Sequence, residues 1–268
     1  MIITDRFVFL AFPRTGTTFV RDVLKQLYLR TEPGLLARMG LRRTPTPARL
    51  RELILPMVDT VMAERAGRES QHGSYRQIPA EARHLPILSV ARNPFDQVVS
   101  AYEHRFWREN PIWDVETLKA EYPGYPELTF EQYVEMMQSH GVRNLLKGKA
   151  PQARVGFLTL RFLKFYGLDP DRLIDSLTDD FIDRELFRPE LASVRFVHTE
   201  NLVPELRGFL AEVGFPPGST EFMTGLPKAN AARPREGRPW SAYYTPELEE
   251  RVQHAERVLF RLFPRYIR

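Results

Sequence analysis

The chain has 268 residues, with 38 Lys and Arg against 34 Asp and Glu, which gives a formal charge of +4. Hydrophobic residues make up 43% and charged residues 27%, values that exclude a disordered chain and a low-complexity fibre. The absence of cysteine excludes disulfides, zinc–thiolate sites and a cysteine nucleophile, and leaves six histidines as candidate bases. The mild positive charge suits an anionic ligand, whereas a nucleic-acid-binding protein more often concentrates its excess charge on one face or tail.

The first predicted unit is a strand, a turn and a helix near the amino terminus. Residues 7–12 form a continuous apolar run, which predicts a strand buried on both faces. This run is too short for a signal-peptide core or a membrane span, so we expect a soluble, cytoplasmic protein. A polar turn occupies residues 13–18, and apolar residues then recur at helical spacing: Phe19, Val20, Val23, Leu24, Leu27 and Tyr28. The order strand, turn, helix predicts the first unit of a parallel α/β sheet.

Two further strands and three helices are predicted later in the chain. Residues 86–91 and 194–198 have strand-like apolar patterns, and each is followed by a helical apolar stripe. Pro94 suits the first turn of the helix after residue 91, and Gly214 suits the end of the helix after residue 198. A last helical pattern ends near residue 262, with Thr245 as its N-cap.

Three less regular stretches separate these units, at residues 31–70, 107–128 and 226–240. They contain prolines and aromatic residues, but none has the composition of an interdomain linker, and the chain has no internal repeat. We therefore predict one α/β domain over residues 1–268, in which a P-loop-like parallel sheet is flanked by helices and carries helical insertions.

The turn at residues 13–18 has the features of an anion-binding loop. Unpaired backbone N–H groups and the helix dipole attract an anion at the start of a helix. Gly16 allows a ligand to approach closely, and Arg14 offers a forked cation that matches phosphate or sulfate oxygens. Thr17 and Thr18 add hydroxyl donors. The loop is not a Walker A motif, since it has one glycine and no lysine, so ATPase or kinase chemistry is disfavoured.

Residues 12–19 (Phe-Pro-Arg-Thr-Gly-Thr-Thr-Phe) resemble the 5′-phosphosulfate loop of sulfotransferases, which use 3′-phosphoadenosine 5′-phosphosulfate (PAPS) as sulfuryl donor. Residues 91–102 resemble the 3′-phosphate motif of the same family, in which an arginine and a serine lie eight residues apart, as Arg92 and Ser100 do. A strand end and a helix position two turns later lie on one side, so both side chains can reach one phosphate. The resemblance implies the sulfotransferase fold, PAPS as donor and no metal.

Weaker matches follow in the order of the family. Residues 198–202 are similar to its Tyr-Glu-Asp-Leu segment, and residues 235–237 with Trp240 are similar to the segment that closes over the 3′-phosphate. A glutamate replaces a lysine at position 236, so Arg233 or Arg238 can make this contact instead. The donor-binding residues that the resemblance implies are Arg14, Thr15, Gly16, Thr17, Thr18, Phe19, Arg92, Ser100, Arg235 and Gly237.

The resemblance also implies a catalytic base. Histidine is the natural base near neutral pH, whereas Arg14 is permanently protonated and can only stabilise charge. His72 lies 20 residues before Arg92, which is about the family's spacing, so His72 and Arg14 are the implied catalytic residues. His104 is the next candidate for the base, and Glu69 stays open because some branches use a glutamate.

The implied acceptor is a hydroxyl group on a glycan, a glycolipid or another small metabolite. This choice follows from a resemblance to the carbohydrate-directed branch, around His72 and over residues 243–266. Aromatic residues can either line an acceptor cleft or pack a lid: Trp107, Trp113, Tyr122 and Tyr125. The alternatives are another P-loop transferase, such as a small-molecule kinase, and a nucleotide-binding module without catalysis. We expect neither a nucleic-acid partner nor a membrane span.

Overall fold

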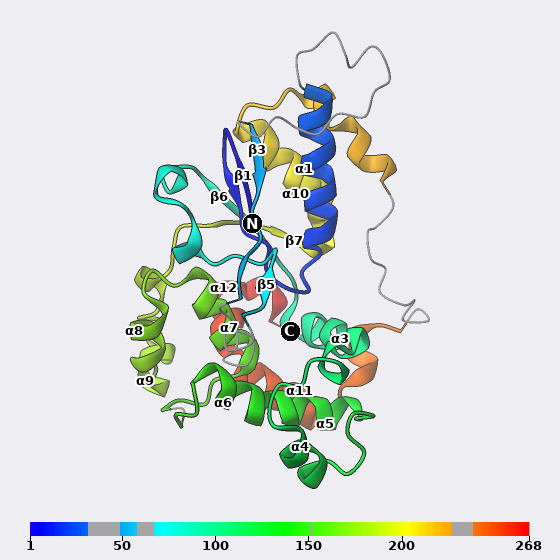
Figure 1. Ribbon diagram of the computed structural model, residues 1–268, viewed down its shortest axis with the longest axis vertical. Coiled ribbons are helices and arrows are strands. Elements are labelled where there is room, and N and C mark those ends of the chain that lie inside the picture. The colour runs from blue at the N-terminus through cyan, green and yellow to red at the C-terminus, as the bar shows by residue number, and fades with distance from the viewer. Residues whose placement is uncertain (32–48, 58–66, 151, 227–237, 268) are drawn as a thin grey trace.

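The computed structural model describes residues 1–31, 49–57, 67–150, 152–226 and 238–267. A five-stranded sheet in the order β3-β1-β2-β6-β7 lies at its centre (Figure 1). Its strands are β1 (Ile2–Thr4), β2 (Val8–Phe9), β3 (Leu50–Glu52), β6 (Ile87–Ala91) and β7 (Arg195–His198). A separate pair is formed by β4 (Leu55–Pro56) and β5 (Glu69–Ser70). The predicted strands β2, β6 and β7 pair in parallel, which confirms the predicted fold class. Strand β1, antiparallel to both its neighbours, was not predicted.

Helices flank the sheet and extend beyond it (Figure 1). Helices α1 and α10 lie together beside the strands, and most of the others gather at the opposite end of the molecule. None of the helices in the described ranges is long and apolar enough to cross a bilayer. Their bounds are α1 (Thr17–Thr31), α3 (Pro94–His104), α4 (Val115–Glu121), α5 (Phe130–Met136), a π-helical turn (Met137–Gly141), α6 (Val142–Leu145), α7 (Phe157–Tyr166), α8 (Pro170–Asp175), α9 (Asp179–Asp183), α10 (Leu202–Glu212), α11 (Pro246–Ala255) and α12 (Arg257–Leu262).

Strand β2 is buried on both faces because its apolar residues alternate between two cores. Phe7 and Phe9 face the core under α1 and α10, whereas Val8 and Leu10 face the core of the larger helical group. Successive side chains of a strand point to opposite sides, so a run without polar residues fits a strand covered by helices on both faces. Packing on both faces therefore fixes the position of β2, from which the next loop starts.

The carboxyl-terminal helical pattern forms two helices rather than one. Thr245 caps α11 as predicted, since its hydroxyl accepts a hydrogen bond from Leu248 N. The helix breaks at Glu256, whose buried carboxylate accepts hydrogen bonds from Leu158 N and Thr159 N at the start of α7. A carboxylate at the amino-terminal end of another helix satisfies N–H groups that the helix itself leaves unpaired.

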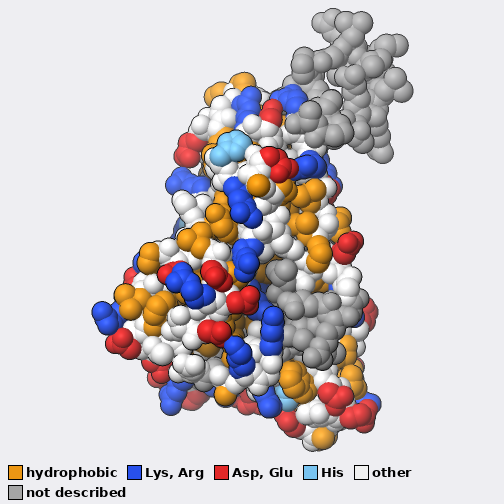
Figure 2. Space-filling view, turned by 60° about the vertical axis from the view of Figure 1, so that its left-hand side comes forward, with side chains coloured by type: hydrophobic (Ala, Val, Ile, Leu, Met, Phe, Trp, Pro, Cys, Tyr) orange, Lys and Arg blue, Asp and Glu red, His pale blue; other side chains and the backbone are white. Residues whose placement is uncertain are grey.

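Acidic and basic side chains are mixed over the helical half of the face shown in Figure 2. Ion pairs also join helices of this half. Arg257 forms an ion pair with Asp179 at the start of α9, and Arg261 Nη2 lies 2.9 Å from Asp183 Oδ1. Exposed pairs of this kind each add little stability, so they fix local geometry more than they stabilise the fold.

Candidate active site

The loop that follows β2, residues 13–18 (the first loop), has a backbone shaped to receive an anion. Arg14 has a φ of 67° and Gly16 a φ of 85°, so two of its residues have left-handed backbone conformations. Such conformations turn N–H groups toward a shared concave side, which attracts anions. A side chain at position 16 would meet only ordinary contacts, so the φ angle, and not space, requires glycine there. Helix α1 starts directly afterwards at Thr17, with the positive end of its dipole at the loop.

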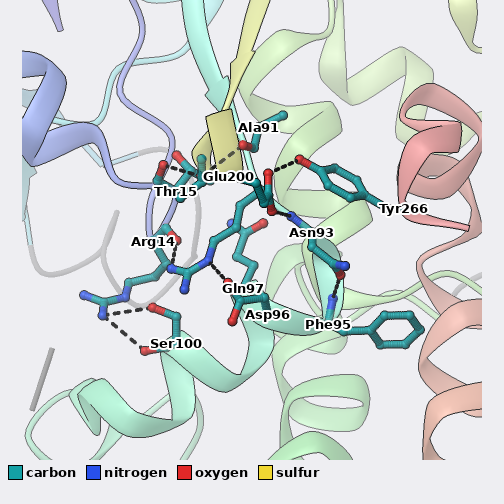
Figure 3. Close-up of polar contacts among 12 residues, drawn as sticks. Arg14, Thr15, Ala91, Asn93, Phe95, Asp96, Gln97, Ser100, Glu200 and Tyr266 are labelled. Carbon is teal, nitrogen blue, oxygen red and sulfur yellow. Dashed lines mark hydrogen bonds and ion pairs between the residues drawn. The ribbon is translucent and has the colours of Figure 1, made fainter. Parts of the chain in front are cut away.

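The loop that follows β6, residues 92–94 (the second loop), meets the first loop at Arg14. Arg92 Nη1 donates to Arg14 O at 2.9 Å, while Arg92 Nε donates to Asp96 Oδ2 at 2.6 Å (Figure 3). Arg14 Nη2 in turn donates to Ser100 O at 3.1 Å and to Ser100 Oγ at 3.3 Å. Strands β2 and β6 are parallel neighbours, so their carboxyl ends place both loops at one edge of the sheet. Arg14, Arg92 and Ser100 therefore form one cluster.

The remaining residues of the first loop differ in exposure. Thr15 and Thr17 are almost fully buried, and Thr15 Oγ1 donates to Phe12 O at 2.8 Å. Thr18 is half-buried. Phe19 packs with the apolar residues between α1 and the sheet and is 8% exposed. Its ring is thus part of the core, and its contact with adenine stays a prediction.

His72 lies beside the end of β2. Its Nδ1 is 2.9 Å from Ala11 O, and its backbone N–H donates to Ser70 Oγ at 3.0 Å. A carbonyl oxygen only accepts hydrogen bonds, so Nδ1 carries the hydrogen when the ring is neutral. The lone pair is then on Nε2, which is the state that a general base requires. His72 is within two residues of Glu69–Ser70, the strand that carries the exposed Glu69.

His104 ends α3 one turn after Ser100. Burial, and then the positive charge of Arg14, lower the pKa of the His104 imidazole. His104 therefore favours its neutral form more than an ordinary histidine does. Two other histidines have carboxylate partners: His140 Nε2 is 2.7 Å from Glu121, and His198 Nδ1 is 2.8 Å from Glu205.

Part of the predicted donor site lies outside the described residues, namely Arg233, Arg235 and Gly237. Arg238 is described and exposed. Trp240 stacks on Phe95 of α3, with ring centroids 4.8 Å apart and planes inclined by 10°. Tyr244 Oη donates to Phe95 O at 3.1 Å. The segment after residue 237 is therefore fastened to the helix that carries Ser100.

Glu200 fastens the carboxyl terminus to the second loop. Its carboxylate accepts hydrogen bonds from Asn93 N at 3.2 Å and from Tyr266 Oη at 2.9 Å (Figure 3). A hollow of about 380 Å³ lies here, lined by Asn93, Asp96, Glu200, Pro239, Trp240, Arg265 and Tyr266. Within the described ranges, His, Asp and Glu side chains form no cluster of three or more suited to a metal ion.

The aromatic residues of the stretch 107–128 divide into two groups. Trp107 and Tyr125 are buried, and Tyr125 Oη donates to Trp107 O at 2.9 Å, so these two pack a core. Trp113 and Tyr122 are half-buried and lie against the ring of His140. The sequence left open whether these aromatic residues line an acceptor cleft or serve in packing, and Trp107 and Tyr125 serve in packing.

Sequence reasoning missed two side chains that contact the first loop. Gln97 Nε2 donates to Pro13 O at 2.8 Å, and Thr199 Oγ1 lies 3.0 Å from Thr15 O. Gln97 is 3% exposed and interrupts the apolar face of α3, which is the one signal that could have identified it. Thr199 belongs to a weak family match and has no local signal of its own.

Three parallel strands in a mixed sheet, with two loops at their carboxyl ends that suit anionic groups, define the class of α/β proteins. A family model described as the sulfotransferase domain matches residues 4–144, which is more than half of the chain. The chain belongs to this family and is an enzyme of the sulfotransferase class. Among solved structures, mouse sulfotransferase SULT7A1 complexed with PAP is 17% identical, with 92% of this chain and 81% of that chain covered and a TM-score of 0.39. No curated protein matches the chain significantly.

Proposed function

We propose that this sulfotransferase moves a sulfuryl group from PAPS to an acceptor hydroxyl by in-line attack, with a histidine as base. The observation that carries the proposal is the meeting of the two loops at Arg14, which puts two anion-suited sites side by side. PAPS has anionic groups at both its 5′ and 3′ positions, so one ligand can engage both loops.

The described residues fit this donor. The first loop offers N–H groups, Thr hydroxyls and the start of α1 to the 5′-phosphosulfate, while Arg92 and Ser100 would hold the 3′-phosphate. The ion pair with Asp96 orients the Arg92 guanidinium, whose remaining N–H groups can face a phosphate. PAPS supplies the activated sulfuryl group. The protein supplies position and electrostatic stabilisation, in which Arg14 and the helix dipole offset negative charge on the transferring group.

We assign the base to His72. Its hydrogen bond to Ala11 O supports this role, because that bond orients the ring and places the lone pair on Nε2. His104 is the competing candidate, since burial and the positive charge of Arg14 lower the pKa of its imidazole and favour the neutral form. The acceptor that we propose is a hydroxyl on a glycan, glycolipid or small metabolite. Support for this choice is the resemblance of residues 243–266 to the carbohydrate-directed branch.

An acceptor screen with radiolabelled PAPS tests the proposal. Wild type should label at least one hydroxyl acceptor without added metal, and it should not turn over ATP. His72→Ala should lower kcat by roughly 10²–10⁴-fold, the usual range for a general base, and should still bind adenosine 3′,5′-bisphosphate (PAP). His104→Gln is the matched control and should keep most of the turnover. The reverse ranking of the two variants would move the base to His104, and magnesium-dependent ATP turnover would favour a kinase.

A further inference from the structure

Three successive carbonyl groups of the first loop accept hydrogen bonds from side chains outside it. The carbonyls of residues 13–15 accept, in order, from Gln97 Nε2 at 2.8 Å, Arg92 Nη1 at 2.9 Å and Thr199 Oγ1 at 3.0 Å. These donors come from α3, from the second loop and from the turn after β7, so three separate elements hold one short stretch of backbone.

Gln97 is an unusual residue for its place in the fold. It is 3% exposed on the buried face of α3, where its neighbours along the core are apolar. Glutamine is rarely buried to this extent unless its amide is hydrogen-bonded. The hydrogen bond from the Gln97 amide to Pro13 O satisfies that condition, and it accounts for a buried glutamine at this position.

Thr199 links the two loops through one hydroxyl. Its Oγ1 lies 3.0 Å from Thr15 O and 3.0 Å from Ala91 O, the residue directly before Arg92. A hydroxyl has a single hydrogen to donate, which these two carbonyls share. The contact therefore sets the distance between the first loop and the strand end from which the second loop starts.

The hydrogen bonds to these three carbonyls determine the direction of the backbone N–H groups in the loop. In a trans peptide the C=O and N–H bonds point in opposite directions, so a carbonyl held outward turns the next N–H inward. The carbonyls of Arg14 and Thr15 share peptide groups with the N–H groups of Thr15 and Gly16, and within the described part of the chain these two N–H groups donate to no protein acceptor. Gln97 holds the peptide group directly before them. The N–H groups of Thr15 and Gly16 are the donors that an anion in the loop would receive.

We propose that Gln97 and Thr199 are positioning residues that hold the first loop in its anion-binding conformation before the donor binds. The proposal rests on the proposed function, because the anion is the 5′-phosphosulfate of PAPS. Neither side chain touches the donor. They act through the carbonyls, and a loop held in place in advance binds its ligand without a cost of rearrangement.

Two ligands that differ by one phosphate separate this role from a general loss of structure. Calorimetry with PAP and with adenosine 3′-monophosphate measures how much the 5′-phosphate contributes to affinity. Gln97→Met and Thr199→Val remove the donors and keep side-chain size. Each should lower the affinity for PAP about threefold to tenfold, the usual effect of one hydrogen bond, and should leave adenosine 3′-monophosphate within twofold of wild type. Thr199→Ser keeps the hydroxyl and should restore the affinity for PAP.

Thr220→Val is the matched control, since the buried Thr220 hydroxyl donates to Pro217 O at 2.9 Å and Thr220 belongs to neither loop. It should lose stability without losing PAP affinity. Equal losses for both ligands in Gln97→Met and Thr199→Val, no loss for either, or loss of the cooperative unfolding transition in both variants would overturn the positioning role. A wild-type protein that binds no PAP would instead refute the proposed function itself.

Discussion

Replacement of Arg92 tests the donor site most directly. The Arg92 side chain is 15% exposed and its guanidinium bonds Asp96 Oδ2 and Arg14 O, so its position is fixed before a ligand arrives. Arg92→Ala would remove a charge-assisted bond to the 3′-phosphate, worth about 1.5–3 kcal/mol, and a bond to the first loop worth about 1 kcal/mol. The affinity for PAP should therefore fall by roughly 10²–10³-fold.

Calorimetric titration with PAP at low salt measures this loss. Arg92→Lys keeps the charge but cannot hold Asp96 and Arg14 O in the same forked geometry, so it should lose about tenfold. Arg184→Ala is the matched control, because Arg184 forms the same type of pair, four residues apart, with Asp180 on an exposed surface. It should bind PAP as wild type does. A PAP affinity of Arg92→Ala within twofold of wild type would refute the reasoning that places the 3′-phosphate at Arg92.

Two further predictions concern backbone conformation and pH. Gly16→Ala should lower the free energy of unfolding by roughly 1–2 kcal/mol and weaken PAP binding, because Gly16 has a φ of 85°. The control is Gly208→Ala in α10, where an added Cβ meets nothing within 4 Å, and this variant should be as stable as wild type or more stable. Burial raises the pKa of the Glu256 carboxyl above its ordinary 4.5, so its contribution to stability is complete below that pH and is lost as pH rises through the folded pKa. Urea unfolding at pH 5 and pH 8 should therefore show wild type losing stability relative to Glu256→Gln, and a constant difference would contradict this.

The sheet was predictable where a strand lies within a longer strand-like pattern, as the two-residue strand β2 does in the apolar run 7–12, and not where a short strand stands alone. Strands β2 and β6 lie in mostly apolar runs whose residues in the strands are all buried, whereas β7 was predicted from a strand-like pattern in which Arg195 is exposed and Val197 is buried. Strand β1 has only three residues, and β4 and β5 have two each, which is too few for a periodic pattern to appear. The break between α11 and α12 was not predictable either. Glu256 is an ordinary residue in a helical sequence, and its hydrogen bonds to the start of α7 join distant parts of the chain.

The candidate site was predictable in the part that its local backbone determines. The sequence singled out Gly16 between a strand and a helix, although its φ of 85° rather than close approach is what requires glycine there. The eight-residue spacing of Arg92 and Ser100 predicted that a strand end and a position on the next helix face one side, and Arg92 directly follows β6 while Ser100 lies on α3. The sequence could not indicate that Arg14 would bond Ser100, because that contact joins residues 86 positions apart. Contacts of this kind depend on how β2 and β6 pair, which a local pattern does not specify.

The same limit explains why Gln97 and Thr199 were missed. A residue that binds a ligand must match the ligand's chemistry, so its type and spacing can be recognised in a sequence. A residue that positions a loop only has to reach a carbonyl group, and any donor of suitable length at a suitable place can do so. Gln97 and Thr199 lie more than 100 residues apart in the chain, yet they bond the carbonyls of Pro13 and Thr15 in the same loop. Donor binding in this enzyme is therefore expected to depend on side chains that never contact the donor.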